Sequence, residues 1–558
     1  MLVETATTTQ VEARPQRRPQ PKPLGKLVRC VLPSFGSLTA LLVFYLLFTN
    51  NYRFLLDSDT GWHIRTGDLI RQTGAVPRHD VFSFTMQGRE WFAWEWLSGV
   101  ALSALHSWRG LVGVAAGAWL VLLLSYTALY RVMLWRGADP IIACAATVFG
   151  AVASLVHWLA RPHLISILLL LTWTVLFESF RRRRSRWIYA TPLLITLWAN
   201  LHGAFVVTFA LVAVYALGET LELAVKGEWR SGQTKLVWYT YTLVGVLSAV
   251  AALGTPYGFK LYGHLWRYLG DTTLLATIDE FKSPDFHSVD GKLIEILLLL
   301  AVIAAIIAAR QRRFVETGLV LFWAHLTLQS ERHVALAVVM LIPIIAEQLS
   351  RLANEAAAKL AERKAGAINA LRDWYRNIRA LDRQLNDALP FALVLIGLWA
   401  LASSAAAEKV FAARFSPKRF PVEAADFIAR NLRTGLLKGN PFAIDQYGGY
   451  LIYRFTPQVQ VFVDGRSDLY RQSTVLDDMN RIAQVRVDGP AWSELLAKYE
   501  IGWMVLPRNE PLALVALQSG RWTSVHTDAT AQVLVSQNLA KQVEVVGAPD
   551  QPPNSHQR

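Results

Sequence analysis

The feature that most constrains this chain is a series of long apolar stretches separated by short polar segments. Several of them approach or exceed the ~20 residues that a helix needs to cross the hydrocarbon core of a bilayer. Of the 558 residues, 53% are hydrophobic and only 18% are charged, which is unlike a soluble enzyme with one core. We therefore predict a polytopic α-helical membrane protein. Eleven spans are expected near residues 31–50, 111–133, 139–158, 163–180, 187–201, 203–223, 235–254, 292–309, 314–330, 333–350 and 388–406.

A twelfth apolar segment, residues 91–108, is shorter and begins with the aromatic sequence WFAWEW. Cytoplasmic loops are enriched in Lys and Arg, and Trp is enriched at membrane interfaces. The basic segments of this chain fall on one side only if residues 91–108 do not cross the membrane. We therefore interpret this segment as a re-entrant or interfacial helix, which gives a cytoplasmic N-terminus. Because the basic loops account for the formal charge of +14, no nucleic-acid partner is expected.

The apolar pattern also predicts the domain organisation of a multi-pass protein of the bacterial inner (plasma) membrane. Residues after 406 are less apolar, and short β-type runs (including 441–445 and 458–464) alternate there with helical patterns, which indicates a small α/β domain. An odd number of spans places this domain outside the membrane. The expected parts are a disordered cytoplasmic tail (1–30), a transmembrane domain (31–406), outer loops (51–95 and 255–290), a cytoplasmic helical segment (351–386), an extracytoplasmic α/β domain (407–540) and a disordered tail (541–558).

In this topology, nearly all the polar residues suited to chemistry fall on the outer side of the membrane. Ionisable residues at a membrane edge are costly, and so they are candidates for function. They come from separate loops that one outer cavity would bring together. The candidate site residues are Asp57, Asp59, His63, Glu95, Arg161, His163, His202, Glu280, Arg332 and His333.

Two carboxylates open the first outer loop in the sequence LLDSDTGWHIRTGDL, residues 55–69. A partly desolvated Asp57 or Asp59 is suited to act as a general base. An Asp directly before an amphipathic helix is equally suited to an N-cap, and the two roles can coexist. Two carboxylates are too few to define a metal site, so a divalent cation such as Mg²⁺ or Mn²⁺ at Asp57 and Asp59 is left open. The two cysteines belong to no metal motif.

Cationic side chains occupy three further turns on the outer side. Arginine binds phosphate through paired donors, so a converging set favours a phosphate or diphosphate ligand. The alternative for each residue is contact with lipid headgroups. These residues are Arg161, His163, His202, Arg332 and His333.

Two further acids have a functional and a simpler interpretation. Glu280 lies in a loop of about 35 residues, and loops of that length are usually functional or disordered. We interpret this loop as a lid over the cavity, with a peripheral helix on the headgroups as the alternative. Glu95 is either a second carboxylate of the cavity or an interfacial residue between anchoring tryptophans.

Four sequence motifs give the chain a resemblance to a known family. With its short first span, acidic outer loop, many further spans and outer α/β domain, the chain resembles the GT-C class of integral-membrane glycosyltransferases. It is most similar to bacterial members related to protein mannosyltransferases and aminoarabinose transferases, over roughly residues 31–540. The motifs are DxDTxWHIRTGxxI (57–70, including Asp57, Asp59 and His63), VPxxDxFSFTxxGxxW…EWLS (76–98), WANLHG (198–203) and GGYLIY…VFVDGRSDLY (448–470).

The resemblance implies an inverting glycosyltransferase that uses a polyprenyl-phosphate-linked sugar. The acceptor would be a hydroxyl of a lipid, glycan or protein at the outer membrane face. Asp59, with Asp57 as the alternative, would be the base, and Arg161, His163, Arg332 and His333 would hold the donor phosphate. Family members often carry adjacent acids in this loop, whereas Ser58 separates them here.

Two other classes of function remain as alternatives. One is a transporter or flippase of a lipid-linked saccharide, although transporters often carry internal repeats with polar sites at the membrane midplane. The other is a non-catalytic membrane scaffold whose outer domain binds a partner. No repeat is found in the sequence, and the candidate residues lie toward one face, which favours the enzyme.

Overall fold

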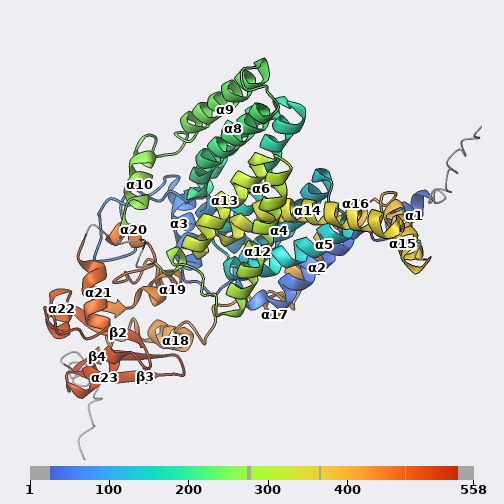
Figure 1. Ribbon diagram of the computed structural model, residues 1–558. Coiled ribbons are helices and arrows are strands. Elements are labelled where there is room, and N and C mark those ends of the chain that lie inside the picture. The colour runs from blue at the N-terminus through green and yellow to red at the C-terminus, as the bar shows by residue number, and fades with distance from the viewer. Residues whose placement is uncertain are drawn as a thin grey trace, which may run out of the picture.

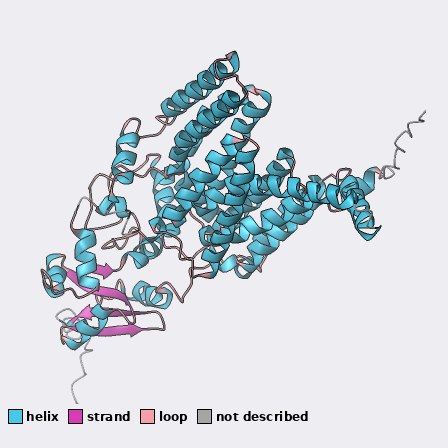
Figure 2. Ribbon diagram, in the orientation of Figure 1, coloured by secondary structure: helices cyan, strands magenta, loops and turns pink. Residues whose placement is uncertain are grey.

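The computed structural model describes residues 25–537 apart from 273, 274, 276, 277, 363–365, 387 and 472. The described chain is mostly helical, with loops between the helices and a small sheet in its C-terminal part (Figures 1 and 2). Most of both expected tails lies outside the described residues. The N-terminal tail was predicted to run to residue 30, which is too far, because α1 (Lys26–Val31) is already helical. The backbone N–H of Asn386 donates to the carbonyl of Arg29 at 2.8 Å and helps to anchor this helix.

Every one of the eleven expected stretches contains a helix, because each has enough consecutive apolar residues to bury or to place in lipid. These helices are α2 (Phe35–Thr49), α4 (Trp96–Arg136), α5 (Pro140–Ala153), α6 (His163–Arg183), α7 (Thr191–Leu201), α8 (Val207–Val225), α9 (Gly232–Ala251), α12 (Val289–Arg310), α13 (Phe314–Gln329), α14 (Val334–Glu362) and α16 (Ala388–Ser403). Within the described residues, six helices are long and apolar enough to cross a membrane. The chain is thus a multi-pass membrane protein, and the number of eleven spans stays a prediction.

The ambiguous segment 91–108 forms the first part of α4, from Trp96 onward. Helical geometry breaks at Arg109 and Gly110, where Gly110 has φ of 57° and ψ of −144°. The chain turns sharply there, since a Cβ on Gly113 would lie 2.1 Å from the carbonyl oxygen of Leu105. The segment is therefore a helix folded back against the span that follows it. Residues 91–95 are not helical.

Shorter elements connect these helices and complete the two expected outer loops. Loop 51–95 contains η1 (Asn51–Arg53) and α3 (Asp59–Thr73), and loop 255–290 contains α10 (Lys260–Leu269) and η5 (Asp279–Phe281). In the expected helical segment 351–386, α14 continues and α15 (Gly366–Asp382) follows. The remaining connections are η2 (Leu155–His157), η3 (Arg186–Ala190), η4 (Gly203–Val206) and η6 (Glu331–His333).

The C-terminal part has the predicted α/β character and lies beside α3, away from α15 and α1 (Figure 1). Its sheet has the order β1-β2-β4-β3, with β1 parallel to β2 and both other pairs antiparallel. The run at 458–464 does not join this sheet, because Val461 instead bridges to Ser83 of the first loop. The elements are α17 (Ala407–Val410), α18 (Val422–Asn431), β1 (Asn440–Ala443), α19 (Asp445–Phe455), α20 (Ser467–Tyr470), α21 (Val475–Ala483), α22 (Trp492–Lys498), β2 (Ile501–Pro507), α23 (Pro511–Gln518), β3 (Trp522–Thr527) and β4 (Ala531–Ser536).

Glycines allow the C-terminal domain to approach α3 closely. A Cβ on Gly61 of α3 would lie 2.4 Å from the carbonyl oxygen of Gly449 in α19. Arg466 also joins the two regions, because it pairs with Asp464 of its own domain and with Asp80 of the first loop, each at 2.7 Å. The C-terminal domain is therefore docked on the segment that carries the acidic motif.

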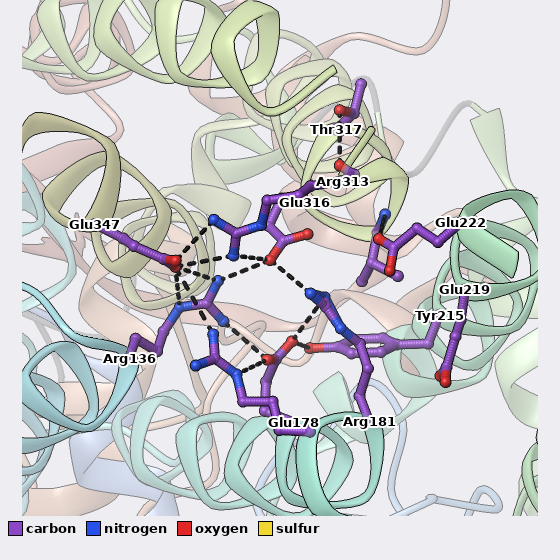
Figure 3. Close-up of polar contacts among 12 residues, drawn as sticks. Arg136, Glu178, Arg181, Tyr215, Glu219, Glu222, Arg313, Glu316, Thr317 and Glu347 are labelled. Carbon is purple, nitrogen blue, oxygen red and sulfur yellow. Dashed lines mark hydrogen bonds and ion pairs between the residues drawn. The ribbon is translucent and has the colours of Figure 1, made fainter. Parts of the chain in front are cut away.

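At the end of the helical domain far from the sheet, four helices are joined by buried ion pairs (Figure 3). Arg136 at the end of α4 contacts Glu178 of α6 at 3.2 Å, Glu316 of α13 at 3.2 Å and Glu347 of α14 at 3.0 Å. Further arginines surround the same acids. We call this set the buried cluster, and it comprises Arg136, Glu178, Arg181, Arg182, Arg313, Glu316 and Glu347.

Candidate functional site

A cavity of about 730 Å³ lies where the helical domain, the two expected outer loops and the C-terminal domain meet. The loop 255–290 contributes α10 and η5 to its wall, in keeping with the predicted lid. Of the ten candidate residues, nine line the cavity, and the tenth, Asp57, contacts two of them, Asp59 and Arg161. The nine are Asp59, His63, Glu95, Arg161, His163, His202, Glu280, Arg332 and His333.

The start of α3 fixes the positions of the two acids of the motif. Asp59 is the first residue of the helix, and its backbone N–H donates to Oδ1 of Asp57 at 2.8 Å. The hydroxyl of Thr60 donates to the carbonyl of Ala160 at 3.1 Å, which fixes α3 against the segment before α6. Asp59 therefore lies within the first turn and is not the N-cap, which is Ser58, and its side chain faces the cavity.

Arg161 gathers three carboxylates from two different loops. Its Nη1 lies 2.8 Å from Asp57 Oδ2 and 2.6 Å from Glu280 Oε1, and its Nη2 lies 2.9 Å from Asp59 Oδ2. We call these four residues the cavity cluster. A guanidinium with several planar donors can pair with more than one carboxylate in this way. The cavity cluster thus ties the motif loop to the expected lid.

Glu95 lies between two histidines in the same cavity. Its Oε2 is 3.4 Å from His63 Nε2, and its Oε1 is 3.4 Å from His202 Nε2. His202 is oriented by Ser166, whose hydroxyl lies 2.8 Å from its Nδ1. Glu95 therefore lines the cavity together with both histidines.

Burial controls the protonation of these acids. Burial and the charge of Asp57 raise the pKa of Asp59 to about 7, although Arg161 acts in the opposite direction. Burial raises the pKa of Glu95 to about 7 as well. Glu280 differs, because Arg161 holds the pKa of its carboxyl well below the ordinary value. Burial lowers the pKa of His63, which keeps that imidazole neutral. The cavity therefore holds two carboxyl groups that change charge near neutral pH.

The remaining candidates differ in how they are held. His163 donates to the carbonyl of His157 at 2.9 Å, and His333 donates to the carbonyl of Leu326 at 3.2 Å. These bonds orient both rings. Arg332 is 3.5 Å from Glu280 and lies over the ring of Phe281 at 4.9 Å. Arg332 is thus held less tightly than Arg161.

The C-terminal domain contributes a wall of the cavity that the candidate list missed. Gly465, Asp468 and Asp445 line it. A Cβ on Gly465 would lie 2.0 Å from Oδ1 of Asp59, so this backbone covers the acid of the motif. Asp468 lies 3.5 Å from His264 of α10. The sequence signal was the DGRSD segment of the last motif, whose Asp-Gly pair is also typical of an ordinary turn.

The donor groups around Asp57 and Asp59 decide whether a divalent cation fits this site. Within the residues that the structure describes, no group of three or more His, Cys, Asp or Glu is arranged to hold a metal ion. The three clustered carboxylates do converge, but the Arg161 guanidinium lies between them. A Mg²⁺ or Ca²⁺ ion needs these oxygens at about 2.0–2.6 Å from one centre. The site as arranged does not fit a divalent cation.

The helical membrane domain with an acidic first loop and a docked α/β domain has the fold of the GT-C class of integral-membrane glycosyltransferases. The oligosaccharyltransferase of Archaeoglobus fulgidus in its apo form matches with a TM-score of 0.54 and 11% identity, over 85% of this chain and 69% of that one. The same archaeal protein, AglB, in complex with an inhibitory peptide and a dolichol-phosphate matches with a TM-score of 0.52 and 11% identity, over 85% and 69%.

ArnT from Cupriavidus metallidurans in the apo state aligns with 13% identity over 90% of this chain and 98% of that chain, with a TM-score of 0.44. No family model matches the sequence. No curated protein matches it either. At 11% identity the archaeal matches establish the fold alone.

Proposed function

We propose that this chain is an inverting glycosyltransferase that moves a sugar from a polyprenyl-phosphate donor to an acceptor hydroxyl. The reaction would take place at the outer face of the bacterial inner membrane, where the topology predicted from the basic loops places the cavity. The observation that carries the proposal is the convergence of a buried acid with a raised pKa, Asp59, with two arginines and several histidines at one end of a GT-C fold. The dolichol-phosphate bound to the archaeal neighbour supports a lipid phosphate as the donor group.

Asp59 is the proposed general base. A carboxylate whose pKa lies near the working pH accepts a proton efficiently while a large fraction of it is still ionised. In the proposed step, the acceptor oxygen attacks the anomeric carbon, and its proton moves to Asp59. The bond between that carbon and the phosphate oxygen breaks, so the polyprenyl phosphate leaves with the electron pair. Attack opposite the leaving group inverts the anomeric carbon.

Arg332 is the proposed main contact of the donor phosphate, together with His163, His202 and His333. Arg161 was the other arginine expected there, but its guanidinium is committed to three carboxylates. By compensating those charges, Arg161 would lower the repulsion that the acids exert on an incoming phosphate. Donor binding therefore depends on both arginines in different ways.

Glu95 is the proposed contact of the sugar or the acceptor. Its carboxyl lies between two imidazoles and faces the same cavity as Asp59. Such a group accepts hydrogen bonds when it is ionised, and it can also donate one when it is protonated. This property suits a ligand rich in hydroxyl groups.

The test uses the full chain purified into lipid nanodiscs with a panel of radiolabelled polyprenyl-phosphate sugars and extracted envelope acceptors. The expected result is sugar transfer from one donor class, abolished by Asp59→Asn. Asp68→Asn is the matched control, because Asp68 lies on the same helix but pairs with Arg65 at 2.9 Å outside the cavity lining. Transfer that continues in Asp59→Asn would overturn the assignment of the base. Donor movement across the bilayer without any transfer would favour the flippase.

A further inference from the structure

The cavity cluster places a single cation where several carboxylates converge. Asp57, Asp59 and Glu280 come from two loops more than 200 positions apart in the sequence, yet one oxygen of each lies within 2.9 Å of an Arg161 nitrogen. Clustered carboxylates repel one another in a partly desolvated site, so they need a positive charge at their centre. Divalent ions often supply that charge in proteins. Here the chain supplies it.

The second oxygens of Asp57 and Glu280 also have polar partners, and that of Asp59 lies against the backbone. Asp57 Oδ1 accepts the backbone N–H of Asp59 at 2.8 Å. Glu280 Oε2 lies 3.5 Å from Arg332. Asp59 Oδ1 faces the backbone of Gly465. A metal ion would have to displace the guanidinium and also compete with these contacts.

We propose that Arg161 is the resident cation of this site and that the protein uses no divalent ion at Asp57, Asp59 and Glu280. In the proposed glycosyltransferase, on which this role rests, Arg161 is a positioning residue. Its guanidinium holds Asp59 in the orientation that faces the acceptor, and it holds the lid through Glu280. Replacing it by lysine would not be conservative, because one ammonium cannot reproduce the planar, multidentate geometry.

Removing the Arg161 side chain should create a site for a divalent cation. Arg161→Ala leaves three carboxylates facing a vacated volume with no central charge. Affinity for a divalent cation rises with the number of charged oxygen ligands around the ion. The variant should therefore gain a Mn²⁺ site that the wild type lacks, and bound Mn²⁺ should raise its unfolding temperature.

The experiment measures Mn²⁺ binding to EDTA-treated full-length protein in zwitterionic nanodiscs by electron paramagnetic resonance. The expected result is that wild type and Asp57→Asn bind Mn²⁺ equally weakly. Arg161→Ala should bind one Mn²⁺ at least ~10-fold more tightly, and Arg161→Ala/Asp57→Asn should lose this gain. A wild-type Mn²⁺ site that disappears in Asp57→Asn would overturn the proposal, as would a folded Arg161→Ala that gains no site.

If Arg161→Ala fails to fold, the comparison of wild type with Asp57→Asn still decides whether the native cluster binds the ion. Sugar transfer by the wild type after EDTA treatment is the second readout, and loss of transfer that Mn²⁺ restores would overturn the proposal. Because Mn²⁺ binding is measured without donor or acceptor, its result does not depend on the proposed reaction. Failure of the glycosyltransferase proposal would appear only in the transfer assay.

Discussion

The cavity cluster and the buried cluster each contain an arginine that contacts three carboxylates, and they lie near opposite ends of α6. Arg161 precedes α6, and Glu178 lies fifteen residues beyond its start at His163, which is a rise of about 22 Å. In the buried cluster, Glu178 and Glu316 have no exposed surface. In the cavity cluster, the Glu280 side chain keeps a third of its surface. The ion pairs of the buried cluster are closed to solvent, whereas those of the cavity cluster are open to a cavity.

The balance of charge differs between the two clusters as well. Four arginines of the buried cluster surround its three glutamates, and Arg351 adds a further contact with Glu347 at 2.8 Å. The cavity cluster has three carboxylates for one arginine. Buried pairs that compensate each other on all sides fix how helices pack and leave little charge for a ligand. In the cavity cluster the carboxylates outnumber the arginine, so one of these carboxylates can instead accept a proton.

The largest expected difference between the clusters is in catalysis. Asp59→Asn should lower the rate of sugar transfer by about 10²–10⁴-fold, the usual contribution of a general base. The variant should remain folded, because its carboxyl is already partly protonated near pH 7. Transfer rate and thermal unfolding measured on the same preparation check both statements.

The raised pKa of Asp59 also predicts how the stability of the Asp59→Asn variant compares with that of the wild type. The pKa of Asp59 rises from 3.8 in an ordinary environment to about 7 in the fold. The folded state therefore holds a proton that the unfolded chain loses, and this stabilisation is present at low pH and is lost as the pH rises through about 7. At pH 8, Asp59→Asn should unfold at the same temperature as wild type or higher. Unfolding at a much lower temperature would mean that Asp59 has a structural role like that of Glu316.

The second prediction concerns the buried cluster. Glu316 contacts Arg136 at 3.2 Å and Arg181 at 2.8 Å, and it pairs with Arg313 too. Glu316→Gln should cost about 3–5 kcal/mol of unfolding free energy, because it leaves buried arginines without one of their carboxylate partners. Thermal unfolding in detergent measures the loss. The rate of transfer per folded molecule should be unchanged.

Glu355→Gln is the control for this variant, since Glu355 lies on α14 with an exposed side chain. It should leave both unfolding and transfer as in wild type. If Glu316→Gln were stable but inactive, the buried cluster would be coupled to the cavity through the helices, and the contrast between the two clusters would fail.

The two clusters were not equally predictable from the sequence. Apolar length located the helices, and the alternation of loops across the membrane brought candidate residues such as Asp59, Arg161 and Arg332 together. That inference needs only topology. Their pairing depends on side-chain positions that no local pattern contains, so the sequence did not indicate that Arg161 binds three acids. Arg181 and Arg182 belong to a run of four arginines, residues 181–184, but two of the acids they approach, Glu316 and Glu347, are more than 100 positions away.

The C-terminal wall of the cavity was unpredictable for a related reason. The DGRSD segment has the composition of an ordinary turn. Its importance comes from the close approach of Gly465 to Asp59, which is set by how α19 packs on α3. A short-range signal cannot reveal a contact that two domains make.

The third prediction tests this contact. A Cβ on Gly465 would lie 2.0 Å from Asp59 Oδ1, so Gly465→Ala should displace the carboxyl. Displacement of a reacting group by about 1 Å can lower the rate by ~10²-fold. Gly397→Ala is the control, because a Cβ there meets nothing within 4 Å. Wild-type transfer by Gly465→Ala would show that the C-terminal domain does not constrain Asp59.

The smallest expected effect, and the one that separates the two acids of the cavity, is the dependence of transfer on pH. If Asp59 must be ionised to accept a proton, the rate should be highest above about pH 7 and should fall ~10-fold per unit below it. Burial gives Glu95 a pKa of about 7 too, so the wild-type profile alone does not identify the base.

Glu95→Gln removes the second titrating group. If Asp59 is the base, the fall in rate below pH 7, here called the acid limb, should persist in this variant. If Glu95→Gln abolished the limb while retaining transfer above pH 7, the titrating group that controls the rate would be Glu95. Asp59 would then act by charge alone, and the cavity cluster would resemble the buried cluster more than its position beside the cavity suggests.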